Sequence, residues 1–242
     1  MTSLLTRLRA TDGRRPQVDP GLAGGLRAWL EDAVADSAQG SRRAGPPLVV
    51  GIGDADADGR SDAAGEIARA LFLLVVSGVT VRHPLEDAIS ALSAGVRGAA
   101  AAERLRRGAR AQRSSARREA ARVAETIAAQ WRPPPASWLP RLGERLRVPL
   151  GGGRVLLAAT TDLALGAPDG RTASVSMVQL RPRPPSEGDR SRRRLLALAE
   201  TLRSGAPPFR VATYHPASGE LVCDDVCDTM LALAVEDVGQ AL

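Results

Sequence analysis

The sequence predicts an α/β (α+β) protein, with a mainly helical N-terminal portion followed by a core of strands and helices. Three observations predict this class. Apolar residues recur at helical spacing through much of the first half, short apolar runs dominate after residue 150, and proline- or glycine-rich stretches separate these segments. Of the 242 residues, 44% are apolar and 25% charged. This composition is typical of globular proteins and excludes wholesale disorder.

Residues 1–20 are polar and are expected to be loose. The helical N-terminal portion then covers residues 21–97. Within it, residues 22–38 carry apolar side chains at every third or fourth position, which is the spacing of one face of a helix. A linker rich in Gly, Pro and Arg follows, and the apolar run LVVGI at residues 48–52 has the length of a short strand.

Two further helices are predicted before the end of this portion. Residues 66–81 are almost continuously apolar, which predicts a buried helix that ends near Gly78. Residues 85–94 form the next helix, since Pro84 suits a first helical turn, where its missing N–H removes no hydrogen bond.

Residues 98–130 are rich in Ala and Arg and predict one long helix or two. Within residues 97–122 there are nine arginines and only two acidic residues, Glu103 and Glu119. Such a stripe either faces the phosphates of a nucleic acid or simply keeps an alanine-rich helix soluble. The Trp-Arg-Pro-Pro-Pro run at residues 131–135 ends the helix, because proline cannot continue it.

After the prolines the pattern changes to strands alternating with helices. Apolar or alternating runs predict strands, leucines at helical spacing predict helices, and turn-forming residues separate them. The predicted strands cover residues 154–165, 172–180, 209–215 and 220–226. The predicted helices cover residues 190–203 and 229–242. The core therefore has the order ββ–α–ββ–α.

The basic residues restrict the possible functions. The chain has no lysine and no asparagine, so the 33 residues counted as lysine or arginine are all arginines. This excludes a Walker-type phosphate loop, a Schiff-base enzyme and a protein kinase, since each needs a lysine. A net charge of +6 and an isoelectric point near 10.8 favour DNA, another nucleic acid or a different polyanion as partner, with GC-rich coding bias as the alternative. Aromatic residues make up only 2%, which argues against a base-stacking surface.

The number of cysteines and the hydropathy of the sequence predict where in the cell the protein is found. Two cysteines spaced C-x3-C and only two histidines make a poor zinc set. Low cysteine use and an N-terminus without a secretory pattern predict a cytoplasmic protein. No apolar run approaches the roughly 18 residues of a membrane-spanning helix, so no membrane partner is expected.

Asp162 is the first candidate for chemistry, because it interrupts an apolar strand. Burying a carboxylate is costly unless it is paired, protonated or bound to a cation, so the position indicates a present or former ligand. A solvent-facing strand edge is the alternative. The next strand ends in the sequence VQLR, and a hairpin would bring Asp162 close to Gln179 and Arg181.

These segments resemble the PD-(D/E)XK nuclease superfamily, and within it the RecB-like branch. The shared order is a helix, a strand ending in Asp, a turn, a strand ending in acid-x-Lys, a helix and a strand. The matching text is ATTDLALGAPDGRTASVSMVQLRP, and the likeness to uncharacterised actinobacterial members covers residues 138–242. With the Arg-rich helix in front, the resemblance implies that residues 98–242 are a nuclease-like core with a mixed sheet flanked by helices.

The resemblance also implies a site. Members use two carboxylates to hold magnesium and a lysine to orient water and stabilise charge. Asp162 matches the first carboxylate and would be the metal ligand, while Gln179 and Arg181 stand at the second carboxylate and the lysine. Glu119 would be the helical acid, with Glu125 as the alternative. A neutral amide weakens a magnesium site and arginine transfers protons poorly, so the resemblance implies a degenerate site.

Two functions stay open after this comparison. One is a nucleic-acid-associated protein that is catalytically degenerate or a weak magnesium-dependent phosphodiesterase. The other is a non-enzymatic scaffold that keeps the fold and binds a protein partner. For the first, the predicted nucleic-acid-binding residues are Arg104, Arg107, Arg110, Arg192 and Arg193.

An acidic loop at residues 54–62 is the remaining motif. Asp54, Asp56, Asp58 and Gly59 resemble the opening of an EF-hand calcium loop, but the glutamate expected at its twelfth position comes one place late. A flexible acidic loop is the better interpretation, and calcium binding is the alternative.

Overall fold

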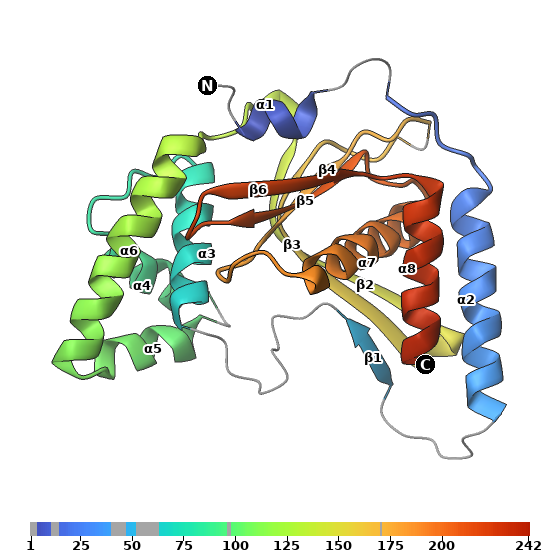
Figure 1. Cartoon of the computed structure of the whole chain (residues 1–242), viewed down its shortest axis with the longest axis horizontal. Coiled ribbons are helices and arrows are strands. Elements are labelled where there is room, and N and C mark those ends of the chain that lie inside the picture. Colours follow the sequence, from blue (N-terminus) through green and yellow to red (C-terminus); the bar gives the residue numbers. More distant parts are fainter. Residues whose placement is uncertain (1–3, 11–14, 40–46, 52–62, 96–97, 170) are drawn as a thin grey trace.

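The computed structural model describes residues 4–10, 15–39, 47–51, 63–95, 98–169 and 171–242. A mixed six-stranded sheet lies at its centre, with helices packed around it (Figure 1). The predicted α/β class is therefore confirmed.

Three consecutive strands form an antiparallel meander: β2 (Pro140–Leu150), β3 (Val155–Leu165) and β4 (Ser176–Leu180). Helix α7 (Glu187–Ser204) follows β4 and crosses over the sheet. A crossover of this kind lets the strand after the helix run parallel to the strand before it.

That next strand is β5 (Arg210–His215), which pairs in parallel with β4, and β6 (Glu220–Asp225) returns antiparallel to β5. The short β1 (Leu48–Gly51) pairs in parallel with the start of β3. The strand order is β1-β3-β4-β5-β6, with β2 also paired to β3.

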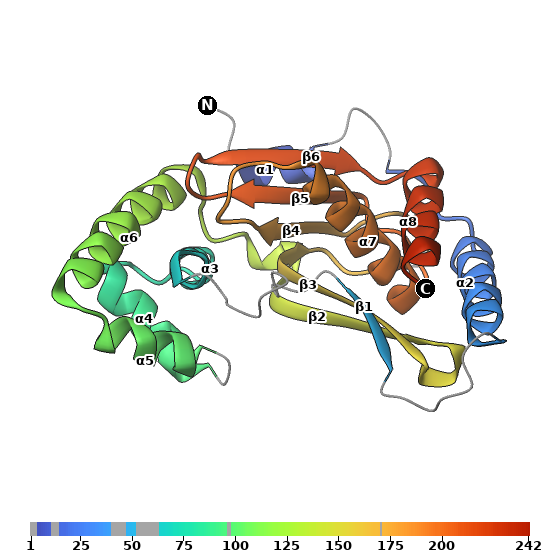
Figure 2. The same ribbon diagram turned by 60° about the horizontal axis from the view of Figure 1, so that its bottom comes forward.

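Helices gather in two groups at opposite ends of the molecule (Figures 1 and 2). Helices α3 to α6 lie at one end, whereas α2, α7 and α8 lie toward the other. The bounds are α1 (Leu4–Arg9), α2 (Leu22–Gln39), α3 (Ala63–Val76), α4 (Pro84–Ala94), α5 (Ala99–Arg107), α6 (Arg110–Gln130) and α8 (Asp228–Ala241). Short 3-10 turns over Ala136–Trp138 and Gly151–Gly153 flank β2.

Each helical group has its own apolar core. Val178 of β4 packs with residues of α3 to α6, whereas its neighbour Met177 packs with α7, α8 and α2. Because successive residues of a strand point to opposite faces, the two groups cover opposite faces of the sheet. The C-terminal ends of β4 and β5 and the N-terminus of α7 meet at one edge, where the candidate site lies.

The N-terminus differs from the prediction. Residues 4–9 form helix α1, and its side chains Leu4, Leu5 and Leu8 are buried against the core. The prediction that residues 1–20 are loose is therefore wrong for this segment. The arginines between the leucines concealed the apolar face, because a six-residue helix shows less than two turns of periodicity.

The core has one more strand than predicted. Strand β2 pairs along its length with β3, but Pro140, Gly143 and Pro149 made the segment resemble a loop. The predicted strand over 172–180 begins only at Ser176. For residues 98–130, where one long helix or two were predicted, the structure has two helices separated at Gly108. The order is therefore βββ–α–ββ–α.

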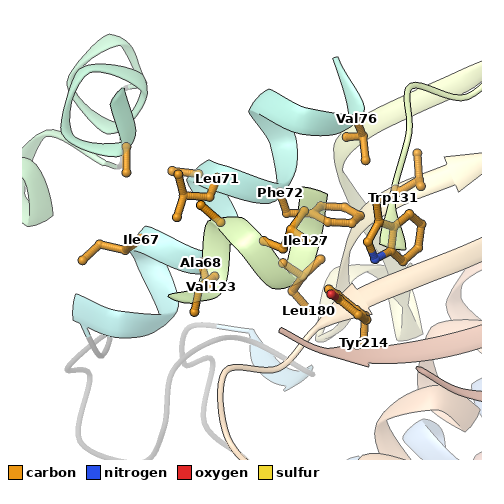
Figure 3. Close-up of a cluster of buried hydrophobic side chains, with 14 of the residues drawn as sticks. Ile67, Ala68, Leu71, Phe72, Val76, Val123, Ile127, Trp131, Leu180 and Tyr214 are labelled. Atoms are coloured by element: carbon orange, nitrogen blue, oxygen red, sulfur yellow. The ribbon is translucent and has the colours of Figure 1, made fainter. Parts of the chain in front are cut away.

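Three aromatic rings join the helices of the first group to the sheet (Figure 3). Trp131, at the end of α6, lies with its ring centroid 4.9 Å from Phe72 of α3 and 5.2 Å from Tyr214 of β5. Both pairs are close to edge-to-face, an arrangement that aromatic rings favour. All three residues are fully buried, so this contact fixes α3 and α6 on the sheet.

Tyr214 predicts how stability depends on alkaline pH. Burial raises the pKa of its phenol from 10.0 to about 12, so the folded state favours the neutral form. The contribution of Tyr214 to the free energy of unfolding is intact below pH 10 and is lost as the pH rises toward 12. By pH 11 the free energy of unfolding should have fallen by about 1.4 kcal/mol for this reason. Urea unfolding at pH 8 and pH 11 should show this loss in the wild type and not in Tyr214→Phe. Equal pH dependence of the two proteins would contradict the prediction.

Candidate functional site

Asp162 and Gln179 lie opposite each other on adjacent strands. Leu163 of β3 pairs with Val178 of β4, Asp162 directly precedes this pair and Gln179 directly follows it. Opposed residues of an antiparallel pair project from the same face of the sheet. The hairpin expected from the sequence is therefore present, and both residues are buried, with 1% and 7% of the whole residue exposed.

The carboxylate of Asp162 contacts both the end of β4 and helix α3. Its Oδ2 accepts a hydrogen bond of 2.7 Å from the backbone N–H of Leu180, which ties β3 to the end of β4. Its Oδ1 lies 2.6 Å from Nε of Arg69, a residue of α3. The Asp162 side chain is only 2% exposed and that of Arg69 is 22% exposed, so this is a largely buried, charge-assisted pair.

Gln179 is held by its amide nitrogen. Nε2 donates a 2.6 Å hydrogen bond to the carbonyl of Thr160, and Oε1 is buried without a hydrogen-bond partner in the described part of the chain. The neighbouring Thr161 hydroxyl donates to the carbonyl of Val178 at 3.0 Å. These bonds join β3 and β4 where their regular pairing ends, so Gln179 helps to fix the local backbone.

Arg181 faces a second buried carboxylate. Its Nε lies 3.5 Å from Oδ1 of Asp189, in the first turn of α7. The other oxygen of Asp189 accepts from the backbone N–H of Ser186 at 2.8 Å, so the same carboxylate caps the helix. The ring of His215 is also buried here, with Nε2 4.0 Å from Asp189 and Nδ1 2.6 Å from the carbonyl of Arg183.

The magnesium ion that the resemblance implies does not fit this set of groups. Magnesium prefers anionic oxygens in an open octahedral arrangement. Here the carboxylate of Asp162 is bonded to a guanidinium and an N–H, Gln179 offers a neutral oxygen, and Arg181 adds a permanent cation. Among the described residues no group of three or more His, Cys, Asp or Glu side chains is placed to hold a metal.

The predicted helical acid does not join this group through any contact of the described residues. Glu119 lies on α6 and pairs with Arg122 on the same helix at 2.6 Å, with 37% of its side chain exposed. The alternative, Glu125, is also exposed on α6. Glu119 is therefore placed as a surface carboxylate, and Arg69 of α3 is the helical partner of Asp162.

The five predicted nucleic-acid-binding arginines have different surroundings. Arg104, Arg107 and Arg110 are exposed on α5 and α6, although Arg107 pairs with Glu103. Arg192 is partly exposed on α7.

Arg193 is buried, contrary to the prediction that it binds nucleic acid. It is only 5% exposed, and it pairs with Asp224 at 2.6 Å and bonds the hydroxyl of Thr213. Its guanidinium joins α7 to β5 and β6, so it is not available to a nucleic acid. Its position within the leucine-rich stripe of a helix was a signal of this buried role.

Sequence reasoning missed Arg69, Asp189 and His215. Arg69 was detectable, because it is the only charged residue between Glu66 and Gly78 in a nearly continuous apolar helix, where a cation needs a partner. Asp189 follows Ser186 at the spacing of a capping box. No local pattern singled out the buried position of His215. The acidic loop of residues 54–62 lies outside the described residues.

Comparison with known proteins gives no family. Neither a scan against models of protein families nor a search of curated proteins finds a match. None of the described helices combines the length and the apolar character that crossing a bilayer requires.

Proposed function

We propose that this chain is a nucleic-acid-associated protein with a nuclease-like fold and a degenerate catalytic site, which binds nucleic acid without cleaving it. The ion pair between Asp162 and Arg69 carries the proposal. The guanidinium of Arg69 lies against the carboxylate that would otherwise bind a metal ion, so the negative charge of Asp162 is already neutralised by the protein.

The order of elements supports the nuclease-like part of the proposal. Helix α6 precedes the meander, Asp162 is on its middle strand, and Gln179 and Arg181 stand at the end of the next strand. A helix and a parallel strand follow. This is the order in which the resemblance places the functional residues.

The chemistry of the site supports the inactive part. Phosphodiester hydrolysis by two metal-binding carboxylates requires anionic ligands and a group that orients water. Asp162 is engaged with Arg69 and Leu180, and Gln179 carries no charge. No lysine exists elsewhere in the chain to replace Arg181. Each of these features opposes the same step, the binding of a divalent cation near the phosphate.

The wild-type protein should show no magnesium-dependent cleavage of DNA or RNA. Labelled duplex and single-stranded substrates would be incubated with magnesium and with manganese, and their binding measured in parallel by fluorescence anisotropy. We expect binding that weakens with salt, and intact substrate. Robust cleavage by the wild type that is lost in folded Asp162→Asn would overturn the inactive assignment. Absence of both cleavage and binding would favour the protein-scaffold alternative.

A further inference from the structure

We infer that helices α5 and α6 form the nucleic-acid-docking surface and that its ligand is the phosphate backbone of double-stranded DNA. The inference rests on the proposed function and adds the place of binding and the form of the ligand. We call the surface made by Arg104, Arg110, Arg113 and Arg118 the arginine face.

The positive charges of these four arginines are not balanced by ion pairs with acidic side chains of the described residues. Helices α5 and α6 contain eight arginines and three glutamates. Four of the arginines form ion pairs with glutamates: Arg106 and Arg107 with Glu103, Arg117 with Glu86, and Arg122 with Glu119. The four arginines of the arginine face are exposed, and none of their side chains bonds to another described residue. Exposed, unpaired cations of this kind are available to phosphates.

The arrangement of the arginine face suits a duplex groove. The buried residues of α6, which include Ala120, Val123 and Ile127, lie in its C-terminal half. Arg110, Arg113 and Arg118 are exposed in its N-terminal half. Arg110 and Arg118 are eight residues apart, which is about 12 Å along a helix and close to the width of the major groove. They are therefore spaced to contact phosphates on both sides of a groove. Helix α6 also lies on the outside of the molecule, away from α2 and α8 (Figures 1 and 2).

The chemistry of the face favours a duplex over a single strand. Neither α5 nor α6 contains Phe, Trp or Tyr, so these helices cannot stack unpaired bases. The aromatic residues Phe72, Trp131 and Tyr214 are buried in the core. A surface that binds only through positive charge binds most tightly to the ligand with the most closely spaced phosphates. Duplex DNA carries about one phosphate charge per 1.7 Å of its axis.

The same surface fits an acidic protein poorly. Protein interfaces are anchored by buried aromatic or large apolar residues surrounded by polar ones. The exposed residues of α5 and α6 are Arg, Ala, Gln, Ser and Glu. The face therefore has cations for phosphates and no apolar anchor for a protein partner.

The test compares two variants with the same change in net charge. One carries Arg110→Gln, Arg113→Gln and Arg118→Gln, since glutamine keeps the helix propensity of arginine. The control carries Arg147→Gln, Arg154→Gln and Arg171→Gln, three exposed positions outside the two helices. Binding to a duplex of about 20 base pairs, roughly twice the span of α6, would be measured by anisotropy over a range of salt concentrations.

For four phosphate contacts the slope of log K against log salt should be about −3.6, a loss of about 150-fold between 50 and 200 mM salt. In the arginine-face variant the slope should fall to about −0.9, with binding at least tenfold weaker at low salt. The control should keep the wild-type slope. Single-stranded DNA of the same length should bind more weakly than the duplex in the wild type.

Three other outcomes are possible, and each would reject a different part of the inference or of the proposed function. Wild-type binding that both variants keep would reject the arginine face and leave the proposed function standing. No binding of any nucleic acid by the wild type would reject the proposed function as well. Tighter binding of single strands or of duplex RNA, or equal binding of polyglutamate, would reject duplex DNA as the ligand.

Discussion

Replacing Asp162 by alanine should lower the free energy of unfolding by about 3 kcal/mol, because it removes one partner of a buried ion pair. Arg69 would lose the carboxylate oxygen that now lies 2.6 Å from its Nε, and the N–H of Leu180 would lose the acceptor that now lies 2.7 Å away. An unsatisfied buried donor costs about 1–3 kcal/mol by itself. Chemical denaturation followed by circular dichroism measures the change directly.

Two control variants accompany this prediction: one separates charge from hydrogen bonding at Asp162, and the other removes an exposed ion pair. Asp162→Asn keeps an oxygen for the N–H of Leu180 but loses the charge, so its effect should be about half as large. Glu119→Ala breaks an exposed ion pair with Arg122 and should change stability by less than about 0.5 kcal/mol. A double-mutant cycle with Arg69→Ala should show that much of the loss belongs to the Asp162–Arg69 pair.

The opposite result would have a clear meaning. A carboxylate kept for a ligand is often a liability to the empty fold, so its removal can stabilise the protein. If Asp162→Ala is as stable as the wild type or more stable, Asp162 is kept for a ligand and the proposal of an inactive site fails. The stability measurement therefore bears on function without any substrate.

The parts of the fold that could be predicted from sequence are those with strong local periodicity. The apolar helix α3, the leucine stripe of α7 and the hairpin of β5 and β6 each follow from their own residues. Strand β2 could not be recognised in this way, because its prolines and Gly143 resemble loop residues and its strand geometry depends on pairing with β3. Helix α1 is too short to show a period.

In the candidate site, the contacts within one hairpin could be predicted from the sequence, but the contacts between distant segments could not. Asp162 and Gln179 follow from one hairpin, so a strand pattern suffices to bring them together. The pairing of Asp162 with Arg69 joins residues 93 positions apart, and the contact of Arg181 with Asp189 depends on where α7 begins. Such partners are set by tertiary packing, which single-sequence periodicity does not encode.

Replacing Trp131 by alanine should have the largest effect of any single change considered, a loss of about 4 kcal/mol in unfolding free energy. The indole is fully buried at the end of α6 and contacts the rings of Phe72 and Tyr214 (Figure 3). Its removal would leave a large cavity between three elements and would also remove the edge-to-face contacts that join them.

Trp29→Ala is the matched control for this change, because the same side chain is removed from a position on α2 that is 48% exposed. Its cost should be about 1 kcal/mol, since less apolar surface returns to water and no closed cavity forms. Urea unfolding of both variants would be compared with the wild type by circular dichroism. Because Trp131 holds α6, Trp131→Ala should also weaken the proposed DNA binding at temperatures where the sheet is still folded. Equal costs for the two tryptophans would show that the helices α3 to α6 do not depend on this aromatic contact for their place on the sheet.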